Sequence, residues 1–222
     1  MVTRYFTPKE VNQHDSAEDA YVSLNKQVLD LSPLIQRYNK MAKFAHLTKP
    51  LVQVAGTDIS HWWDAESNDL KTCVDIRTGM RTYAQPNGRF PHIPTLFPDS
   101  NIDLSYEEPW WKDPQYVIGE LTNKTRQIRI INTLTGDEVQ LEVCAEETLM
   151  DIFRERYIHI NAHALSYTWK RLDPEPRELD MTLTLDANGI EDETESFESL
   201  GLNADYYIPA IHLYYNDDLT EA

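Results

Sequence analysis

The sequence has few cysteines, few glycines and few basic residues, and each shortage argues against a class of protein. Cys73 and Cys144 are the only cysteines in 222 residues, so a disulfide framework is excluded and the reduced thiols of a cytosolic protein are expected. With seven glycines, a phosphate site built from glycine amides is not expected. The net charge of −17 argues against nucleic acid as a partner, because a phosphate backbone attracts a basic face.

Long apolar runs are absent as well. No stretch approaches the ~20 residues needed to cross a bilayer, so a membrane is not expected as a partner. Residues 1–8 are polar and aromatic, unlike the basic and then apolar start of a secretory signal. The chain has no Gly-x-Ser-x-Gly elbow and no dinucleotide fingerprint, and we therefore expect a protein that is not an enzyme.

Charge divides the chain into two parts. Residues 1–122 contain 12 basic and 16 acidic residues, a net charge of −4, and the remainder contains 8 basic and 21 acidic residues, a net charge of −13. This asymmetry predicts two units with a junction at residues 122–125. The acidic second part suits a basic protein partner, although an acidic solvated surface is the commoner reason for such a composition.

Two helix starts are predicted in the first part. Thr7 can cap a helix, Pro8 suits the first helical position, and Glu10 follows the cap by three residues. Residues 32–33, Ser-Pro, open a second helix. Its apolar face comprises Leu34, Ile35 and Tyr38.

The strands of the first part are separated by a long turn-rich region. Residues 21–24 and 27–31 read as a hairpin joined at residues 25–26, and residues 116–121 read as a closing strand. Between residues 63 and 109 the chain is rich in proline and turn residues, which indicates a functional loop or an extension wrapped on the core. Within its last part, the pair Trp110–Trp111 is interpreted as packing this loop onto the domain, with anchoring of a partner as the alternative.

The second part has the order strand, hairpin, strand, helix and further strands, which is the β-grasp order of a small α+β unit. Strands are expected at residues 128–131, 139–143, 167–169 and 210–215. Gly136 suits a hairpin turn, and Thr148 with Asp151 resembles a capping box. The helix after it has an apolar face of Leu149, Ile152, Phe153 and Tyr157. Residues 173–176 are expected to form a turn and residues 190–199 an acidic connection.

Four stretches of the first part resemble the cytochrome b5 family in their order and spacing. They are residues 5–11, 28–31, 55–58 and 118–121. We therefore predict a cytochrome b5-like domain over residues 1–122 with a long loop insertion. The family holds haem iron between two histidines, the first in a His-Pro-Gly-Gly turn. Here residues 38–41, Tyr-Asn-Lys-Met, stand at that turn and the second histidine falls near Asn68, so the domain is degenerate.

Residues 133–136, 141–143, 147–149 and 184–190 resemble ubiquitin. The resemblance predicts a ubiquitin-like β-grasp domain over residues 126–216, followed by a tail at 217–222. The whole chain is then α+β, a cytochrome b5-like domain followed by a ubiquitin-like domain. Because no diglycine follows residue 216, we expect a fixed contact module rather than a tag for conjugation.

The cytochrome b5 resemblance implies haem b as a cofactor, and other donors must then hold the iron. Imidazole is the commonest axial donor, and thiolate and phenolate also serve. The candidates are His61, His92, Cys73 and Tyr83. The alternatives are that His61 is a polar residue at a helix end, that His92 is a loop histidine held by backbone contacts, and that Cys73 is an inert buried thiol. His159 and His163 have no third ligand, so zinc is not expected.

Taken together, the chain resembles a family of radial spoke stalk proteins of ciliary axonemes, most closely at residues 58–62 and 216–220. The resemblance implies a structural subunit of motile cilia or flagella, located in the cytoplasm, cytoskeleton and axoneme. Its implied partners are radial spoke and other axonemal proteins, and haem binding under oxidising conditions would make it a redox sensor. The alternatives are a soluble electron-transfer haem protein of cytochrome b5 type and a haem-free ubiquitin-like adaptor.

Overall fold

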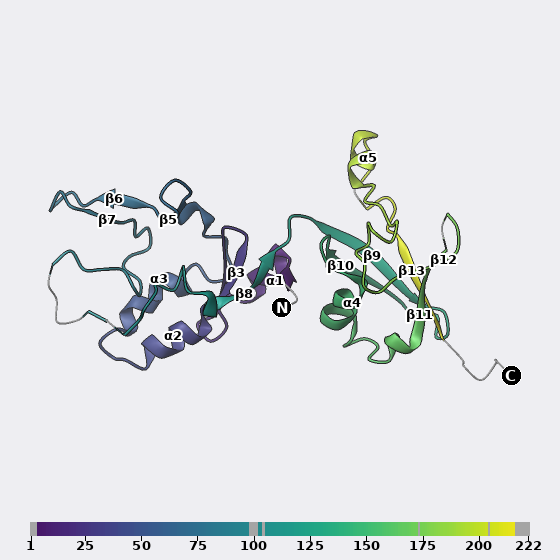
Figure 1. The fold of residues 1–222 in the computed structure, drawn as a ribbon, viewed down its shortest axis with the longest axis horizontal. Helices are drawn as coiled ribbons and strands as arrows, with labels where there is room; N and C mark the ends of the chain where they lie inside the picture. The colour runs from purple at the N-terminus through teal and green to yellow at the C-terminus, as the bar shows by residue number, and fades with distance from the viewer. Residues whose placement is uncertain (1–3, 98–101, 104, 173, 204, 216–222) are drawn as a thin grey trace. The chain divides into compact units, whose positions relative to one another are not determined.

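The computed structural model describes residues 4–97, 102–103, 105–172, 174–203 and 205–215 (Figure 1). The chain divides into two compact units, Met1–Leu121 and Thr122–Ala222. Each unit has its own sheet, its own helices and its own hydrophobic core, so both are α+β. No helix in these ranges is long and apolar enough for a membrane span.

The N-terminal unit is built on a four-stranded sheet in the order β1-β8-β3-β2. These strands are β1 (Tyr5–Phe6), β2 (Tyr21–Leu24), β3 (Gln27–Asp30) and β8 (Val117–Leu121). The predicted hairpin is confirmed, and both of its turn residues, Asn25 and Lys26, have positive φ angles of 51° and 69°. A two-residue turn with this geometry matches the right-handed twist of the strands that it joins.

The helices of this unit are short. They are α1 (Pro8–Gln13), α2 (Ser32–Asn39) and α3 (Lys49–Val52), with single turns at Ala45–Thr48, Ser60–Trp62 and Pro114–Tyr116. The predicted capping box is present, since the Thr7 hydroxyl accepts the Glu10 N–H at 3.1 Å and the Glu10 carboxylate accepts the Thr7 N–H at 2.7 Å. Helix α2 buries the predicted face of Leu34, Ile35 and Tyr38.

The region between residues 63 and 109 contains two small hairpins and part of the core. The hairpins are β4 (Trp63–Asp64) with β5 (Asp69–Leu70), and β6 (Thr72–Val74) with β7 (Arg81–Tyr83). Phe90 stacks on Trp62 at 5.4 Å between ring centroids and meets Trp110 and Trp111 edge-on at 5.9 and 6.1 Å. All four rings are buried. The interpretation of the tryptophan pair as packing residues is confirmed.

The C-terminal unit has a five-stranded sheet in the order β10-β9-β13-β11-β12. The strands are β9 (Thr125–Asn132), β10 (Glu138–Cys144), β11 (Tyr167–Arg171), β12 (Arg177–Glu178) and β13 (Ala210–Tyr215). The last strand, β13, lies in the middle and runs parallel to β9, while the other neighbours are antiparallel. The predicted strands are thus confirmed, and β12 was not predicted.

A helical segment packs on this sheet. Helix α4 (Leu149–Ile152) begins at the predicted capping box of Thr148 and Asp151 and continues as a π-helical turn, Phe153–Tyr157. A buried ion pair fixes its position, because Arg156 contacts both oxygens of Glu147 at 2.8 Å, and Glu147 also accepts the N–H of Cys144 at 2.9 Å. The pair joins the end of β10 to the helix.

One expectation for the C-terminal unit needs correction, and others concern residues that the structure does not describe. The predicted acidic connection at residues 190–199 contains a helix, α5 (Thr194–Ser199), which has no buried residue and stands away from the sheet in Figure 1. Ala164–Ser166 forms a further single turn. Asp173 of the predicted turn, Asn216 and the tail at residues 217–222 lie outside the described residues.

Gly119 of β8 lies where two strands approach closely. A β-carbon there would overlap the carbonyl oxygen of Arg4 and would lie 2.8 Å from the ring of Phe6. We expect Gly119→Ala to lower the free energy of unfolding of the N-terminal unit by about 2–3 kcal/mol, because the added methyl group displaces β1 from the sheet. Urea unfolding measures this loss. The matched control is Glu120→Ala at the next, exposed position, which should stay within about 0.5 kcal/mol of the parent. Equal effects of both variants would contradict the packing argument.

Candidate functional site

The four predicted iron ligands all lie in the N-terminal unit, in three different environments. His61 is exposed in the turn Ser60–Trp62, and its ring meets the buried Trp62 edge-on at 6.0 Å. The alternative reading of His61, a polar residue beside a core tryptophan, describes this arrangement. The placement leaves one side of the imidazole in solvent rather than in an enclosed site.

Cys73 and Tyr83 lie on the β6–β7 hairpin. Cys73 is exposed, which corrects the alternative reading of a buried thiol. The Tyr83 hydroxyl donates to the carboxylate of Asp69 at 3.2 Å, and its ring packs against Trp111 at 5.6 Å. Burial, and then the negative charge of Asp69, raise the pKa of the Tyr83 phenol. Because a phenol must lose its proton to bind iron well, this environment disfavours Tyr83 as a ligand.

His92 is the only one of the four that is buried, with 7% of its surface exposed. Its ring stacks on Tyr106 at 3.8 Å, and its Nδ1 accepts the backbone N–H of Trp110 at 2.8 Å. Its backbone has a positive φ of 70°, which is uncommon for residues other than glycine, although asparagine, aspartate and histidine adopt it more often than the rest. The reading of His92 as a loop histidine held by backbone contacts matches these contacts.

Burial and the bond to Trp110 together determine the charge and the tautomer of His92. Burial lowers the pKa of His92 to about 4, while the nearby carboxylates of Asp103 and Asp113 oppose this shift more weakly. The ring is therefore neutral at pH 7, and since Nδ1 accepts a hydrogen bond, the proton lies on Nε2. Within the described residues that Nε2–H has no acceptor. A neutral imidazole binds a metal through an unprotonated nitrogen, so coordination through Nε2 would require His92 to give up the bond to Trp110.

These environments do not fit a haem iron held between two histidines. His61 and Cys73 are exposed, His92 carries its proton on the available nitrogen, and Phe90 is buried in contact with three tryptophan rings. In the described part of the chain no three His, Cys, Asp or Glu side chains come together as a metal site. His61, His92, Cys73 and Tyr83 as iron ligands stay predictions.

Tyr38, which opens the tetrapeptide standing in place of the His-Pro-Gly-Gly turn, has a different use here. Its buried hydroxyl donates to the carboxylate of Asp103, and Arg37 donates to Ser105. Burial and the bond to Asp103 raise the pKa of Tyr38, so the phenol stays protonated. The end of α2 is thus a docking point for the long loop. Asp103 and Ser105 were not singled out in the sequence because no local pattern links them to residues some 65 positions away.

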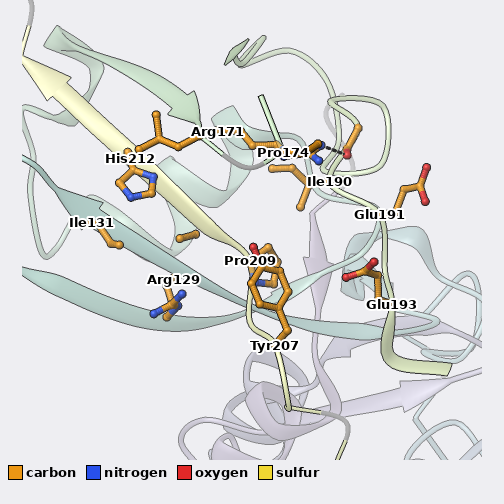
Figure 2. A pocket seen from close by; sticks show the side chains of 13 residues that line it. Arg129, Ile131, Arg171, Pro174, Ile190, Glu191, Glu193, Tyr207, Pro209 and His212 are labelled. Carbon is orange, nitrogen blue, oxygen red and sulfur yellow. Dashed lines mark hydrogen bonds between the residues drawn. The ribbon is translucent and has the colours of Figure 1, made fainter. Parts of the chain in front are cut away.

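The C-terminal unit carries a groove of about 590 Å³ on the face of its sheet where Arg129 and His212 lie (Figure 2). Arg129 donates to Ile208 and Glu138, each at 3.2 Å, and Figure 2 shows the hydrogen bond from Arg171 to the loop at Gly189. Burial lowers the pKa of His212, whose Nδ1 has no partner among the described residues. No site residue predicted from the sequence lies in this groove. Side chains alternate between the two faces of the sheet along β13, so His212 lies on the face away from the buried Ile211.

The protonation of His92 gives a pH-dependent prediction. The native ring stays neutral down to about pH 4, whereas the unfolded chain binds a proton below its ordinary pKa of about 6.5. The stability that His92 contributes is therefore complete above pH 6.5 and is lost as the pH falls toward 4, by on the order of 3 kcal/mol at most. His92→Asn is the matched variant, because asparagine tolerates positive φ and can accept the Trp110 N–H without titrating. Urea unfolding of both proteins at pH 7 and pH 4.5 should show the larger loss in the parent, and equal losses would refute the assignment.

Comparison with known proteins supports the cytochrome b5 reading of the sequence, although no protein-family model matches the chain. A Xenopus laevis protein is 50% identical over 218 residues, which cover 98% of this chain and 97% of the relative. A Homo sapiens protein is 47% identical over 218 residues, with 98% and 92% covered. Both are named cytochrome b5 domain-containing protein 1, as is a Xenopus tropicalis protein that is 48% identical. The chain therefore belongs to the family of cytochrome b5 domain-containing protein 1.

Proposed function

We propose that the chain is a structural subunit of the radial spoke stalk in motile cilia, and that both units serve as contact surfaces. The assignment to the cilium is supported by the resemblance of the sequence to radial spoke stalk proteins. The structural role is supported by one observation above all, the aromatic core around Phe90. A buried cluster of contacting aromatic rings suits a rigid contact module better than a carrier of a large cofactor.

The second unit fits the same role as a ubiquitin-like module over residues 126–216. Its first two strands form a hairpin, and its last described strand, β13, lies between β9 and β11 with α4 packed on the sheet. This arrangement is what a β-grasp fold requires. Such a module offers a stable surface to neighbours in an assembly. The N-terminal module, residues 1–122, is assigned as the degenerate cytochrome b5-type domain.

Electron transfer of the cytochrome b5 kind is the less favoured function. It requires an iron with two strong axial ligands and a path to the surface. His92 offers iron no unprotonated nitrogen, because its Nδ1 accepts the Trp110 N–H and its Nε2 carries the proton. His61 is exposed. A haem-free ubiquitin-like adaptor outside cilia is the remaining alternative, and it is distinguished by where the protein resides.

Extraction of isolated axonemes tests the proposed function directly. We expect the protein to stay with the axoneme in detergent and low salt and to be released by high salt together with spoke components, because polar contacts between subunits are screened by salt. Quantitative immunoblotting of each fraction measures this. Tubulin serves as the marker of intact doublets. Recovery of the whole pool in the detergent-soluble fraction, or abundant protein in non-ciliated cells, would favour the adaptor.

Titration of the purified chain with haemin tests the cofactor prediction separately. If an iron ligand is among the predicted residues, an oxidised Soret band should appear and should weaken in one of the single variants His61→Ala, His92→Asn or Cys73→Ser. Tyr83→Phe completes the set for the fourth candidate. An unchanged band in all four variants would remove these residues as ligands. A six-coordinate low-spin spectrum that is reversibly reduced by a flavin reductase would instead revive the electron-transfer alternative.

A further inference from the structure

The β6–β7 hairpin carries three exposed large apolar side chains. We define residues 71–83 as the arm. It presents Val74 with 59% of its surface exposed, Met80 with 47%, and Ile76 with 100%. Single exposed apolar side chains are common, but three within seven residues concentrate apolar surface in one hairpin, as protein interfaces do. Figure 1 places the arm on the side of the unit away from β3 and β8.

The arm is also basic in an otherwise acidic chain. The arm contains Lys71, Arg77 and Arg81 against a single acidic residue, Asp75, a net charge of +2 where the whole chain carries −17, and Arg89 follows six residues after it. The side chain of Arg77 is 89% exposed, and its nearest carboxylate oxygen, on Asp75, is 3.8 Å away. An ion pair at that distance whose cation is solvated contributes little to folding. The positive charge of the arm therefore has no evident structural use within the unit.

The backbone of the arm has an open edge. Strands β6 and β7 pair only with each other in the described residues, with Cys73 opposite Thr82 and Val74 opposite Arg81. The backbone of Asp75 bonds to Met80, and that of Ala84 bonds to Lys71. Because bonded and non-bonded pairs alternate in an antiparallel ladder, the N–H and C=O of Thr72 and Val74 point away from β7, toward the free edge. Such an edge is a template for an added strand.

A groove lies beside the arm and continues its chemistry. It has a volume of about 480 Å³ and is lined in part by Arg77, Arg89 and Phe97. Phe97 has 62% of its surface exposed, and Arg89 already donates to the carbonyl of Ile93 at 3.2 Å. The groove also includes Thr82 of β7, so its cations and aromatic ring lie on the Thr82 face of the hairpin and could receive carboxylates and apolar side chains from one extended segment.

We propose that the arm is a docking site for an acidic, extended segment of a partner protein, which adds to the β6 edge as a third strand. Alternate side chains of that segment would contact Val74 and Ile76, and its carboxylates would lie on the other face, that of Thr82, where Arg77 and Arg89 line the groove. The inference rests on the proposed role as a contact subunit and names the surface and the chemistry of the partner. It is tested on the purified full chain, so its failure is separate from failure of the axonemal assignment.

The experiment measures binding of a short fluorescein-labelled peptide, in which Glu alternates with Val, by fluorescence anisotropy. A peptide with Lys in place of Glu is the control ligand. We expect saturable binding of the Glu peptide that weakens as salt is added, and weaker or no binding of the Lys peptide. The double variant Arg77→Glu/Arg81→Glu should weaken binding of the Glu peptide by about tenfold or more. These two side chains are on the exposed arm, so we expect the fold to be retained, as circular dichroism can verify.

Two further variants make the test specific. Lys40→Glu/Lys49→Glu changes the net charge by the same amount at exposed positions away from the arm, and it should leave binding within about twofold of the parent. Val74→Pro removes the edge N–H without removing a bond to β7, and it should abolish strand addition, whereas Val74→Thr should preserve it. The proposal would be overturned if the parent does not bind the Glu peptide. It would also be overturned if both charge variants lose this binding equally. Sedimentation that shows self-association of the parent and its loss in Arg77→Glu/Arg81→Glu would assign the arm to a second copy instead.

Discussion

The packing of Phe90 against Trp62, Trp110 and Trp111 determines the character of the N-terminal unit. The sheet and helices of this unit are too short to enclose a core alone, since α2 has eight residues and α3 has four. The segment between β7 and β8 provides the missing apolar volume, and aromatic rings deliver much of it for few ordered residues. A region that the sequence suggests as an insertion is therefore part of the core. His92, two residues after Phe90, becomes buried as a consequence, and the bond from Trp110 compensates part of the cost of that burial.

The C-terminal unit is held together in another way. Its core is a sheet with one helical segment, and polar groups inside it fix the connections. Asn188, 1% exposed, donates to the carbonyls of Asp180 and Thr184 and accepts the N–H of Asp180, which closes the loop before the last strand. Arg126 reaches across the unit to the carbonyl of Ile190. Satisfied polar networks of this kind make a single conformation more favourable than its alternatives.

Local signals predicted the elements of both units well. The capping boxes at Thr7 and Thr148 depend on residues three positions apart, so they can be read directly from the chain, and the turn at residues 25–26 is set by its two neighbouring strands. The course of residues 84–113 could not be predicted, because it depends on contacts such as that between Tyr38 and Asp103, which no periodic pattern reports. The environment of His92 depends on the same contacts. The sequence could name His92 as a candidate but could not show which of its nitrogens carries the proton.

The position of β1 has a consequence for how the chain acquires its structure during synthesis. β1 pairs in parallel with β8, with Tyr5 opposite Glu120, so the two ends of the N-terminal unit meet in one sheet. Parallel pairing across so many residues cannot begin until the whole unit has left the ribosome. Until then β8 covers neither the edge of β3 nor the apolar face of α1. The nascent chain therefore exposes Phe6, Val11 and Val28, which form one small cluster in the folded unit. Chaperone binding to the nascent chain should therefore persist until Leu121 emerges, when translation of the acidic second unit has already begun.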